Sequence, residues 1–270
     1  MQKSLKIAAN TFVVKLINRT RFRIMHKEQY ALLEKVGITQ VLNRWISKET
    51  PIDLQEFVLR NYSKSLGQLQ QDLWALHNYM ALHKPDGTKG YFVEFGATDG
   101  LLRSNSYLLE KEYGWEGILC EPARAYHEDL HRNRTAIIDH RCVFSSTGQV
   151  PEFHEVKSLE LSGIKEFKHI GGWENERKDF KSYEVDTVSL NDLLVEHNAP
   201  QCINYVSIDT EGSEYEILKE FPFEKWIIDA FSIEHNYSEN QAKIDQLMHR
   251  NGYKKVYANQ SCWDSWYIRN

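Results

Sequence analysis

Short apolar runs alternate with amphipathic helical segments in the C-terminal two thirds of the chain, from residue 91 onward. Apolar runs of this length, bounded by polar turns, predict strands, and their alternation with helices predicts a mostly parallel sheet. The predicted strands cover residues 91–95, 117–121, 136–139, 205–209 and 227–234. Between the first two strands, Ser104 or Asn105 would cap a helix that ends at Gly114. The pattern therefore predicts an α/β fold.

The end of the chain follows a different pattern. Two aromatic strands, joined by a turn at residues 258–261, are predicted from the segment YKKVYANQSCWDSWYIRN. Consecutive strands with so short a connection pair antiparallel. We therefore expect an antiparallel hairpin that closes the sheet.

A helical region precedes the sheet. Residues 28–83 mix polar and apolar positions at helical spacing and contain few Gly or Pro. The segment HKPDGTKG, residues 83–90, gathers Pro, Asp and two Gly, which is typical of a turn between domains. We predict a helical N-terminal region over residues 1–88 and a second domain over residues 89–270.

The first 27 residues carry seven Lys or Arg and no Asp or Glu, and their apolar positions recur at helical spacing. A basic amphipathic helix of this kind lies on an anionic membrane surface, or it docks on protein with its basic face in water. The pattern leaves both interpretations open. Residues 1–27 are thus a candidate for peripheral membrane contact.

Composition and charge narrow the class of protein. Apolar residues make up 41% of the chain and charged residues 26%, with a formal net charge of -5. These values are ordinary for a globular protein and argue against a nucleic-acid partner, which would require a basic surface. The four cysteines lie far apart without a C-x-x-C pair, which favours reduced thiols. No long apolar run and no secretory signal pattern appears. We expect a cytoplasmic protein, with peripheral contact at the inner face of the membrane left open.

The stretch VEFGATDG has the spacing of a nucleotide-binding loop and spans the end of the first predicted strand. Gly96 and Gly100 would let a ligand approach the backbone closely. Glu121 ends the next strand, where an acidic side chain accepts hydrogen bonds from a ribose diol. Thr98 stands where a dinucleotide-binding fingerprint has its middle glycine.

Two ligand classes compete for this loop. NAD carries a pyrophosphate, which requires an uncluttered loop at a helix N-terminus. S-adenosylmethionine has no phosphate, so its loop tolerates Ala97 and Thr98. Its sulfonium and amino groups are cationic, and Glu94 at the end of the first strand is placed to favour them. The alternative for Glu94 is a structural role, satisfied by backbone N–H groups.

A second acidic group lies downstream, in the segment SIDTEGSEYEIL. Asp209 ends a central strand, and ligands bind at the carboxyl ends of parallel strands. Glu211 and Glu214 are predicted to open the following helix, where acids complement the helix dipole. The next strand ends with Glu234 and His235 at the same edge of the sheet.

Chemistry at this edge would require a general base, and Asp209 or His235 would serve. A structural, hydrogen-bonded role is the alternative for His235. Asp209 together with Glu234 would also suit a divalent cation such as Mg²⁺. Two carboxylates at separate strand ends leave the presence of a metal undecided.

A long insert covers residues 155–185, between the third and fourth predicted parallel strands. A loop of this length in a compact domain is usually functional or mobile. It contains an aromatic residue and several cationic ones: Lys165, Lys168, His169, Trp173, Arg177 and Lys178. Such groups suit contact with sugar rings and with phosphate or carboxylate groups. A solvated surface excursion is the alternative.

Four segments in order, VEFGATDG, SNSYLLE, YGWEGILCEP and VSIDTEGSEYEIL, resemble the FkbM family of S-adenosylmethionine-dependent methyltransferases. The similarity extends from residue 91 to the end of the chain. It implies a class I methyltransferase (Rossmann-like) fold, with a seven-stranded, mostly parallel sheet, helices on both faces and a closing antiparallel hairpin.

The resemblance also implies roles for individual residues. It assigns the cofactor loop and its surroundings to Glu94, Gly96, Ala97, Gly100, Asn105 and Ser106. It places the cofactor ribose at Glu121. Cys142 and Val143, after the third strand, fall where the family has its adenine neighbourhood, although RCVFSS departs from the alanine-rich sequence usual there.

These observations lead to one hypothesis and two alternatives. The hypothesis is an S-adenosylmethionine-dependent O-methyltransferase that modifies a sugar hydroxyl in a glycan, glycolipid or glycosylated metabolite; this acceptor class rests on the resemblance. A nicotinamide-dependent oxidoreductase is the enzymatic alternative, and Thr98 and Glu94 count against it. A non-catalytic methyltransferase-fold partner of glycan-assembly enzymes is the other. The N-terminal helices would shape the acceptor side, form a homodimer, or bring the chain to a membrane-borne glycan.

Overall fold

The computed structural model describes residues 38–83, 89–173 and 175–270. Contacts between Cα atoms divide the chain into two units, Met1–Ser63 and Lys64–Asn270, and each is considered by itself. The predicted amphipathic helix at residues 1–27 lies outside the described residues, as do residues 84–88 of the predicted turn cluster. In the described part of the chain, no helix combines the length and apolar character needed to cross a bilayer.

The described part of the N-terminal unit is a pair of packed helices, α3 (Ile38–Trp45) and α4 (Ile52–Asn61). Their connection is held by Gln55, whose side-chain amide donates to the carbonyl oxygens of Ser47 and Thr50, each at 2.8 Å. Ser47 Oγ also accepts from the Thr50 N–H group at 3.2 Å, so side chains satisfy backbone groups of the turn between the helices.

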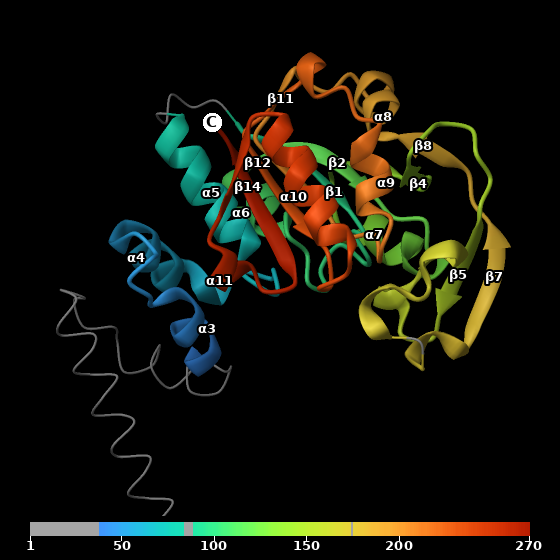
Figure 1. Cartoon of the computed structure of the whole chain (residues 1–270), viewed down its shortest axis with the longest axis horizontal. Coiled ribbons are helices and arrows are strands. Elements are labelled where there is room, and N and C mark those ends of the chain that lie inside the picture. Colours follow the sequence, from blue (N-terminus) through green and yellow to red (C-terminus); the bar gives the residue numbers. More distant parts are fainter. Residues whose placement is uncertain (1–37, 84–88, 174) are drawn as a thin grey trace, which may run out of the picture. The chain divides into compact units, whose positions relative to one another are not determined.

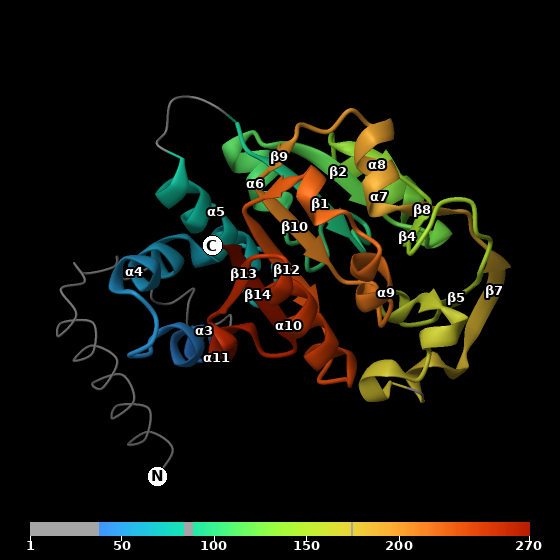
Figure 2. The same cartoon turned by 45° about the horizontal axis from the view of Figure 1, so that its top comes forward.

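The C-terminal unit is built on a seven-stranded sheet in the order β13-β14-β12-β10-β1-β2-β3 (Figures 1 and 2). Its strands are β1 (Tyr91–Phe95), β2 (Glu116–Cys120), β3 (Ile137–Asp139), β10 (Tyr205–Ile208), β12 (Ala230–Glu234), β13 (Tyr253–Val256) and β14 (Asp264–Arg269). Strands β1, β2, β3, β10 and β12 run parallel, and β14 pairs antiparallel with both β12 and β13. The sheet is therefore mostly parallel, with the antiparallel pairs at one side.

Helices cover both faces of this sheet, because successive residues of a strand point to opposite sides. Val93, Val206 and Phe231 share one core with helices α8 (Leu190–Glu196), α9 (Glu214–Lys219) and α10 (Asn240–Arg250). On the other face, Trp74 of α5 (Gln71–Leu82) stacks on Trp266 at a ring-centroid distance of 4.9 Å. Helix α6 (Tyr107–Tyr113) packs beside α5.

The predicted strands agree with the observed ones to within two residues in most cases. The exception is the segment 227–234, which forms β11 (Ile227–Ile228) and β12 with a break at Asp229. The Asp229 carboxylate accepts from the Asn204 amide at 2.8 Å and pairs with His83 at 2.7 Å. Asn204 likewise separates β9 (Cys202–Ile203) from β10, so paired polar side chains interrupt both neighbouring strands.

Two features of the structure differ from the prediction. The connection predicted as a turn at residues 258–261 is a short helix, α11 (Ala258–Ser261). Helix α5 belongs to the same compact unit as the sheet and packs on it through Trp74. The boundary between residues 88 and 89 stays a prediction, but helix α5 just before it is part of the sheet's core.

The described residues of the insert at 155–185 form a small subdomain. Strands β5 (Glu152–Val156), β6 (Gly163–Ile164) and β7 (Phe180–Glu184) form an antiparallel sheet in the order β6-β5-β7. It is inserted between β4 (Cys142–Phe144) and β8 (Thr187–Ser189), which pair with each other. A core of Phe153, Ile164 and Val185 joins it to Tyr126 and Phe144. Figures 1 and 2 show β5 and β7 at the margin of this unit, next to β4 and β8.

Candidate active site

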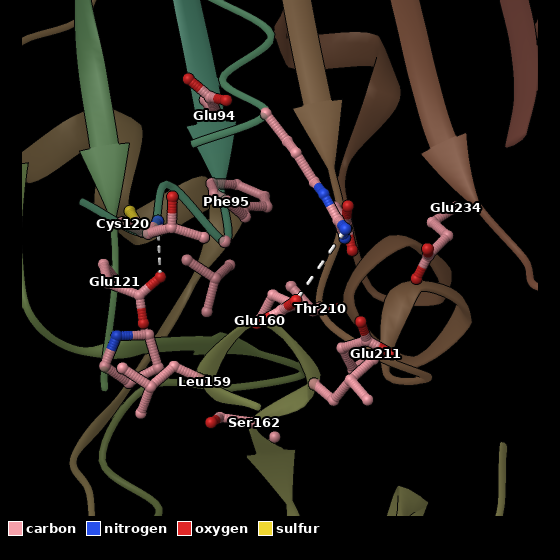
Figure 3. Close-up of a pocket in the computed structure, with 18 of the residues that line it drawn as sticks. Glu94, Phe95, Cys120, Glu121, Leu159, Glu160, Ser162, Thr210, Glu211 and Glu234 are labelled. Atoms are coloured by element: carbon pink, nitrogen blue, oxygen red, sulfur yellow. Dashed lines mark hydrogen bonds and ion pairs between the residues drawn. The ribbon is translucent and has the colours of Figure 1, made fainter. Parts of the chain in front are cut away.

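A cavity of about 420 Å³ opens at the carboxyl ends of the central parallel strands (Figure 3). Residues following β1, β2, β10 and β12 form its floor, and the segment from Leu159 to Ile164 of the insert forms the opposite wall. The position agrees with the rule that open α/β sheets bind ligands at this edge. The inserted subdomain thus completes the site on the side that the main sheet leaves open.

The loop after β1 requires glycine at two positions. Gly96 has φ +71°, and a Cβ atom there would lie 2.1 Å from the carbonyl oxygen of Asp209. Gly100 has φ +79°, and its Cβ would lie 2.5 Å from Cγ of Arg134. Gly96 and Thr98 line the cavity, while Ala97 and Gly100 are buried and shape the loop from behind. The loop is therefore held close to the sheet, with its backbone at the cavity wall.

The loop does not lead directly into a helix. Helix α6 begins only at Tyr107, whose N–H group is already occupied. Ser104 Oγ accepts from the N–H groups of Ser106 and Tyr107, at 3.3 and 3.1 Å. The N-cap residue is nevertheless Ser106, not the predicted Ser104 or Asn105, and its own side chain makes no capping hydrogen bond. A further turn therefore lies between the glycine loop and the helix.

Glu121 lies at the end of β2 and is buried in the cavity wall. Its Oε2 accepts from the Thr98 N–H at 2.8 Å, and its Oε1 accepts from the Ala123 N–H at 2.7 Å. Burial raises the pKa of Glu121 to about 7, which the charge of Asp209 reinforces and the two backbone hydrogen bonds oppose. A carboxylate with unused lone pairs at the cavity wall can accept hydrogen bonds from hydroxyl groups.

Glu94 is held by the protein itself. Its carboxylate accepts from the Asn105 N–H at 2.7 Å, from Ser104 Oγ at 3.0 Å, and from Ser106 Oγ. Arg134 lies 3.8 Å away and compensates its charge. These contacts are those of the structural alternative, in which Glu94 anchors the start of α6. Part of the side chain still borders the cavity.

Asn105 and Ser106 lie on different sides of this network. Ser106 is buried behind the loop, where its Oγ accepts from Arg134 Nη2 at 2.8 Å. Asn105 lines the cavity and donates from Nδ2 to Ser207 Oγ at 3.0 Å. Its Oδ1 is buried and has no hydrogen-bond partner among the described residues. An unpaired acceptor at a cavity wall is suited to a ligand that donates hydrogen bonds.

Cys142 and Val143 form part of the cavity wall from strand β4. Both are buried, and burial raises the pKa of the Cys142 thiol to about 12. The thiol therefore stays protonated at neutral pH and acts as an apolar surface.

Three carboxylates converge on the opposite side of the cavity, and we call them the acid cluster: Asp209, Glu211 and Glu234. Each offers an oxygen, and these oxygens lie within 4.8 Å of one another. Burial, followed by the charge of Asp209, raises the pKa of both Glu211 and Glu234. Burial also raises the pKa of Asp209. The acid cluster brings together residues from two strand ends and from the loop between β10 and α9.

Comparison with protein families identifies the family of the chain. The model of the methyltransferase FkbM domain matches residues 94–255, from the end of β1 into β13. The chain belongs to this family. A comparison with curated proteins finds no match. The mostly parallel seven-stranded sheet is consistent with a methyltransferase fold, and the domain supports methyltransferase activity.

The two base candidates of this FkbM domain have different surroundings. Asp209 is partly exposed and lines the cavity. His235 is buried, does not line the cavity, and accepts from the Tyr237 N–H through Nδ1 at 3.0 Å. Burial lowers the pKa of His235, so its imidazole is neutral near pH 7. Only Asp209 of the two is placed to meet a ligand in the cavity.

The cavity lining of the FkbM domain includes residues that the sequence offered no reason to place there, such as Arg103 and Tyr237. Arg103, with φ +55°, reaches across the cavity to Glu160, with Nη2 3.9 Å from Oε1. Trp173 from the insert and Tyr237 after β12 are exposed aromatic residues at the rim. Glu211 was expected in the helix, but it lies before α9 with φ +60°. A backbone turned in this way points the side chain into the cavity.

Proposed function

We propose that the protein is an S-adenosylmethionine-dependent O-methyltransferase that acts on a sugar hydroxyl. The observation that carries this proposal is the charge of the cavity. Its described lining contains one Lys or Arg side chain, that of Arg103, against the six carboxylates of Glu94, Glu121, Glu160, Asp209, Glu211 and Glu234. An acidic cavity of this kind favours a ligand with cationic groups over a dinucleotide with two phosphates.

Ion pairs within the protein neutralise three of these carboxylates. Glu94 lies beside Arg134, Glu160 beside Arg103, and Glu211 beside Arg177. The other three, Glu121, Asp209 and Glu234, form no ion pair within the described residues. The remaining negative charge would attract the ammonium and sulfonium groups of S-adenosylmethionine.

The start of helix α6 argues against a nicotinamide dinucleotide. A pyrophosphate requires exposed N–H groups at a helix N-terminus. Here the N–H groups of Asn105, Ser106 and Tyr107 donate to Glu94 and Ser104 instead. The carboxylate of Glu94 already uses the Asn105 N–H group as a donor, so the oxidoreductase alternative loses support.

The residues of the cavity fit the proposed cofactor. Glu121 would accept hydrogen bonds from the ribose hydroxyls of S-adenosylmethionine. Asn105 Oδ1 would accept one from the cofactor's cationic amino group. Cys142 and Val143 would provide an apolar surface for the adenine ring. Gly96 would allow the ligand to approach the backbone. Bound there, S-adenosylmethionine would supply a methyl group activated by a positively charged sulfur.

The acid cluster would take the proton from the acceptor hydroxyl. A general base works best with a pKa near the working pH, and burial raises the pKa of Asp209 from its ordinary value. Asp209 lies at the cavity surface, where a hydroxyl can reach it. The aromatic rim suits a sugar, whose C–H faces pack on the exposed rings of Trp173 and Tyr237.

Calorimetry of the full chain tests the cofactor. S-adenosylmethionine and S-adenosylhomocysteine should bind, and NAD should not. Binding of NAD alone would overturn the proposal, and binding of none of the three would favour the non-catalytic alternative.

Transfer of a labelled methyl group to a panel of glycosides tests the reaction. Asp209→Asn should lower turnover by at least about 100-fold, because loss of a general base typically costs that much. Its affinity for S-adenosylhomocysteine should stay close to that of the parent. Equal turnover of parent and variant would remove Asp209 from the role of base.

A further inference from the structure

The acid cluster has the composition of a cation site. Asp209 follows β10, Glu234 ends β12, and Glu211 lies on the loop before α9. Each of these three carboxylates offers a ligand oxygen, and the three oxygens lie within 4.8 Å of one another. The set contains oxygen ligands without nitrogen or sulfur, which hard cations prefer.

The neighbouring side chains neutralise the acid cluster only in part. Arg177 Nη2 binds Glu211 Oε2 at 2.5 Å, which compensates one of the three charges. Glu214 is turned toward the backbone, where its Oε1 accepts from the N–H groups of Thr210 and Gly212, at 3.0 and 2.9 Å. Asp209 and Glu234 form no ion pair among the described residues, although the charge of Arg103 acts on Asp209 and opposes the rise in its pKa. A buried carboxylate without an ion pair, such as that of Glu234, requires a proton or a cation.

An unpaired oxygen of Glu234 also indicates a cation site. Its side chain is 8% exposed, and Oε2 is buried without a hydrogen-bond partner in the described part of the protein. Buried carboxylate oxygens are normally satisfied, so an unsatisfied one indicates a missing partner. Figure 3 shows the carboxylates of Glu211 and Glu234 turned toward each other on one side of the cavity. The unpaired oxygen thus lies where the other two carboxylates converge.

We propose that Asp209, Glu211 and Glu234 bind one divalent hard cation, Mg²⁺ or Mn²⁺. Three carboxylates would leave several of its about six coordination positions for oxygens from outside the protein. Since the acid cluster lines the cavity, those positions face the ligand space. The cation site stands on the cluster itself, and only its role toward an acceptor rests on the proposed function.

That role follows from the chemistry of a bound hydroxyl. A divalent cation lowers the pKa of a hydroxyl whose oxygen coordinates it, so a sugar hydroxyl bound there would lose its proton more readily. The proton would pass to the carboxylate oxygen of Asp209 that does not bind the cation, since each residue of the acid cluster offers one ligand oxygen. Two neighbouring sugar oxygens would occupy two of the open positions. The site would therefore favour acceptors with a vicinal diol, of which one hydroxyl is methylated.

The test uses Mn²⁺ as a probe on the full chain, freed of metals by a chelator and studied without cofactor or acceptor. Electron paramagnetic resonance or calorimetry should show one Mn²⁺ site per chain that Mg²⁺ competes for. Glu234→Gln should weaken Mn²⁺ binding by at least about tenfold, because affinity depends on ligand charge. Glu160→Gln removes a carboxylate from the same cavity but not from the acid cluster, and it should bind Mn²⁺ like the parent.

Thermal unfolding shows whether a variant is still folded, so loss of Mn²⁺ binding can be distinguished from loss of structure. In chelator, Glu234→Gln should melt no lower than the parent, because the amide removes a repulsive buried charge. Mn²⁺ should raise the Tm of the parent and of Glu160→Gln, but not that of Glu234→Gln. Absence of Mn²⁺ binding to the parent, or equal binding by Glu234→Gln, would overturn the site and leave protons as the partners of the cluster. S-adenosylmethionine binding without metal binding would leave the proposed function intact, and the reverse result would leave the cation site intact.

Discussion

At the scale of residues, glutamate side chains have different roles, which depend on their hydrogen-bond partners. Glu214 and Glu94 are held by the protein's own hydrogen-bond donors, so they stabilise local structure. Glu121 is half satisfied, with two backbone N–H groups and free lone pairs at the cavity. Glu234 has an oxygen without a partner among the described residues. The number of unsatisfied lone pairs therefore separates structural glutamates from those available to a ligand.

The pH dependence of cofactor binding should depend on Glu121. Its pKa is raised to about 7, mainly by burial, and a ribose hydroxyl requires the ionised form as acceptor. Affinity for S-adenosylhomocysteine should therefore fall as the pH drops below 7, by up to about tenfold per pH unit. In Glu121→Gln the affinity should be lower at pH 8 and nearly independent of pH.

Titration calorimetry between pH 5.5 and 8.5 measures both effects. Glu160→Gln, which alters the cavity rim without changing Glu121, should keep the slope of the parent. If Glu121→Gln also kept that slope, the titrating group would have to be sought in the acid cluster.

At the scale of elements, the inserted subdomain is tied to the acid cluster by one arginine. Arg177 Nη1 donates to the carbonyl oxygens of Lys168 and Ile170, at 3.1 and 3.0 Å, while Nη2 binds Glu211. The insert also packs closely on Gly212, where a Cβ atom would lie 2.9 Å from Ile170 Cδ1. The wall of the cavity and its acidic floor are thus positioned together.

Replacing this arginine should loosen the insert more than the sheet. Arg177→Met leaves a buried carboxylate and several carbonyl oxygens without their donor, which costs about 1–3 kcal/mol per buried unsatisfied group. Hydrogen exchange, followed by mass spectrometry, should become faster in residues 159–178 and remain unchanged in β1 and β10. The exposed neighbour Lys178, changed to Met, provides the matched control and should exchange like the parent. Uniform acceleration over the whole chain would instead indicate global destabilisation.

At the scale of the whole molecule, buried acids set the pH at which the protein is most stable. Burial raises the pKa of Asp72, Glu121 and Asp264 to about 7 each. Two other carboxyls, Glu110 and Asp139, have a pKa lowered to about 2: burial opposes this shift, but cationic partners, chiefly Arg134 for Glu110 and Arg141 for Asp139, outweigh it. The two groups act in opposite directions on stability.

The sign of each effect predicts an optimum. Asp72, Glu121 and Asp264 have a pKa of about 4 in the unfolded chain, so they bind more protons in the folded state. Their contribution to the free energy of unfolding is therefore lost as the pH rises through 7. The second group contributes above pH 4, and its contribution is lost as the pH falls toward 2. The Tm should therefore be highest near pH 5 and fall toward pH 8.

Differential scanning calorimetry in chelator measures this curve. Asp264→Asn should reduce the fall in Tm between pH 5.5 and 8, because one raised carboxyl is removed. A Tm that rises steadily to pH 8 would show that the buried acids do not control the stability of this protein.

The sequence alone determined the elements and the edge at which the site lies. Strand positions follow from apolar runs. The turn after β1 follows from Gly96, a position at which any other residue would be strained. Because carboxyl ends of parallel strands share one edge, the positions of Glu121 and Asp209 were predictable from their places at strand ends. These features depend on neighbours in the chain, which local patterns record.

Only the tertiary structure decided which side chains meet. Arg177 reaches Glu211 over 34 residues of sequence, and Glu234 reaches the same cluster from another strand. His235 and Asp209 looked equivalent at the sheet edge, yet packing buried the first and left the second at the cavity. The direction of a side chain and its distant partners depend on how elements pack, which no local pattern contains. For this reason the sequence indicated the family and the edge of the sheet, while the acid cluster and its open lone pair required the folded chain.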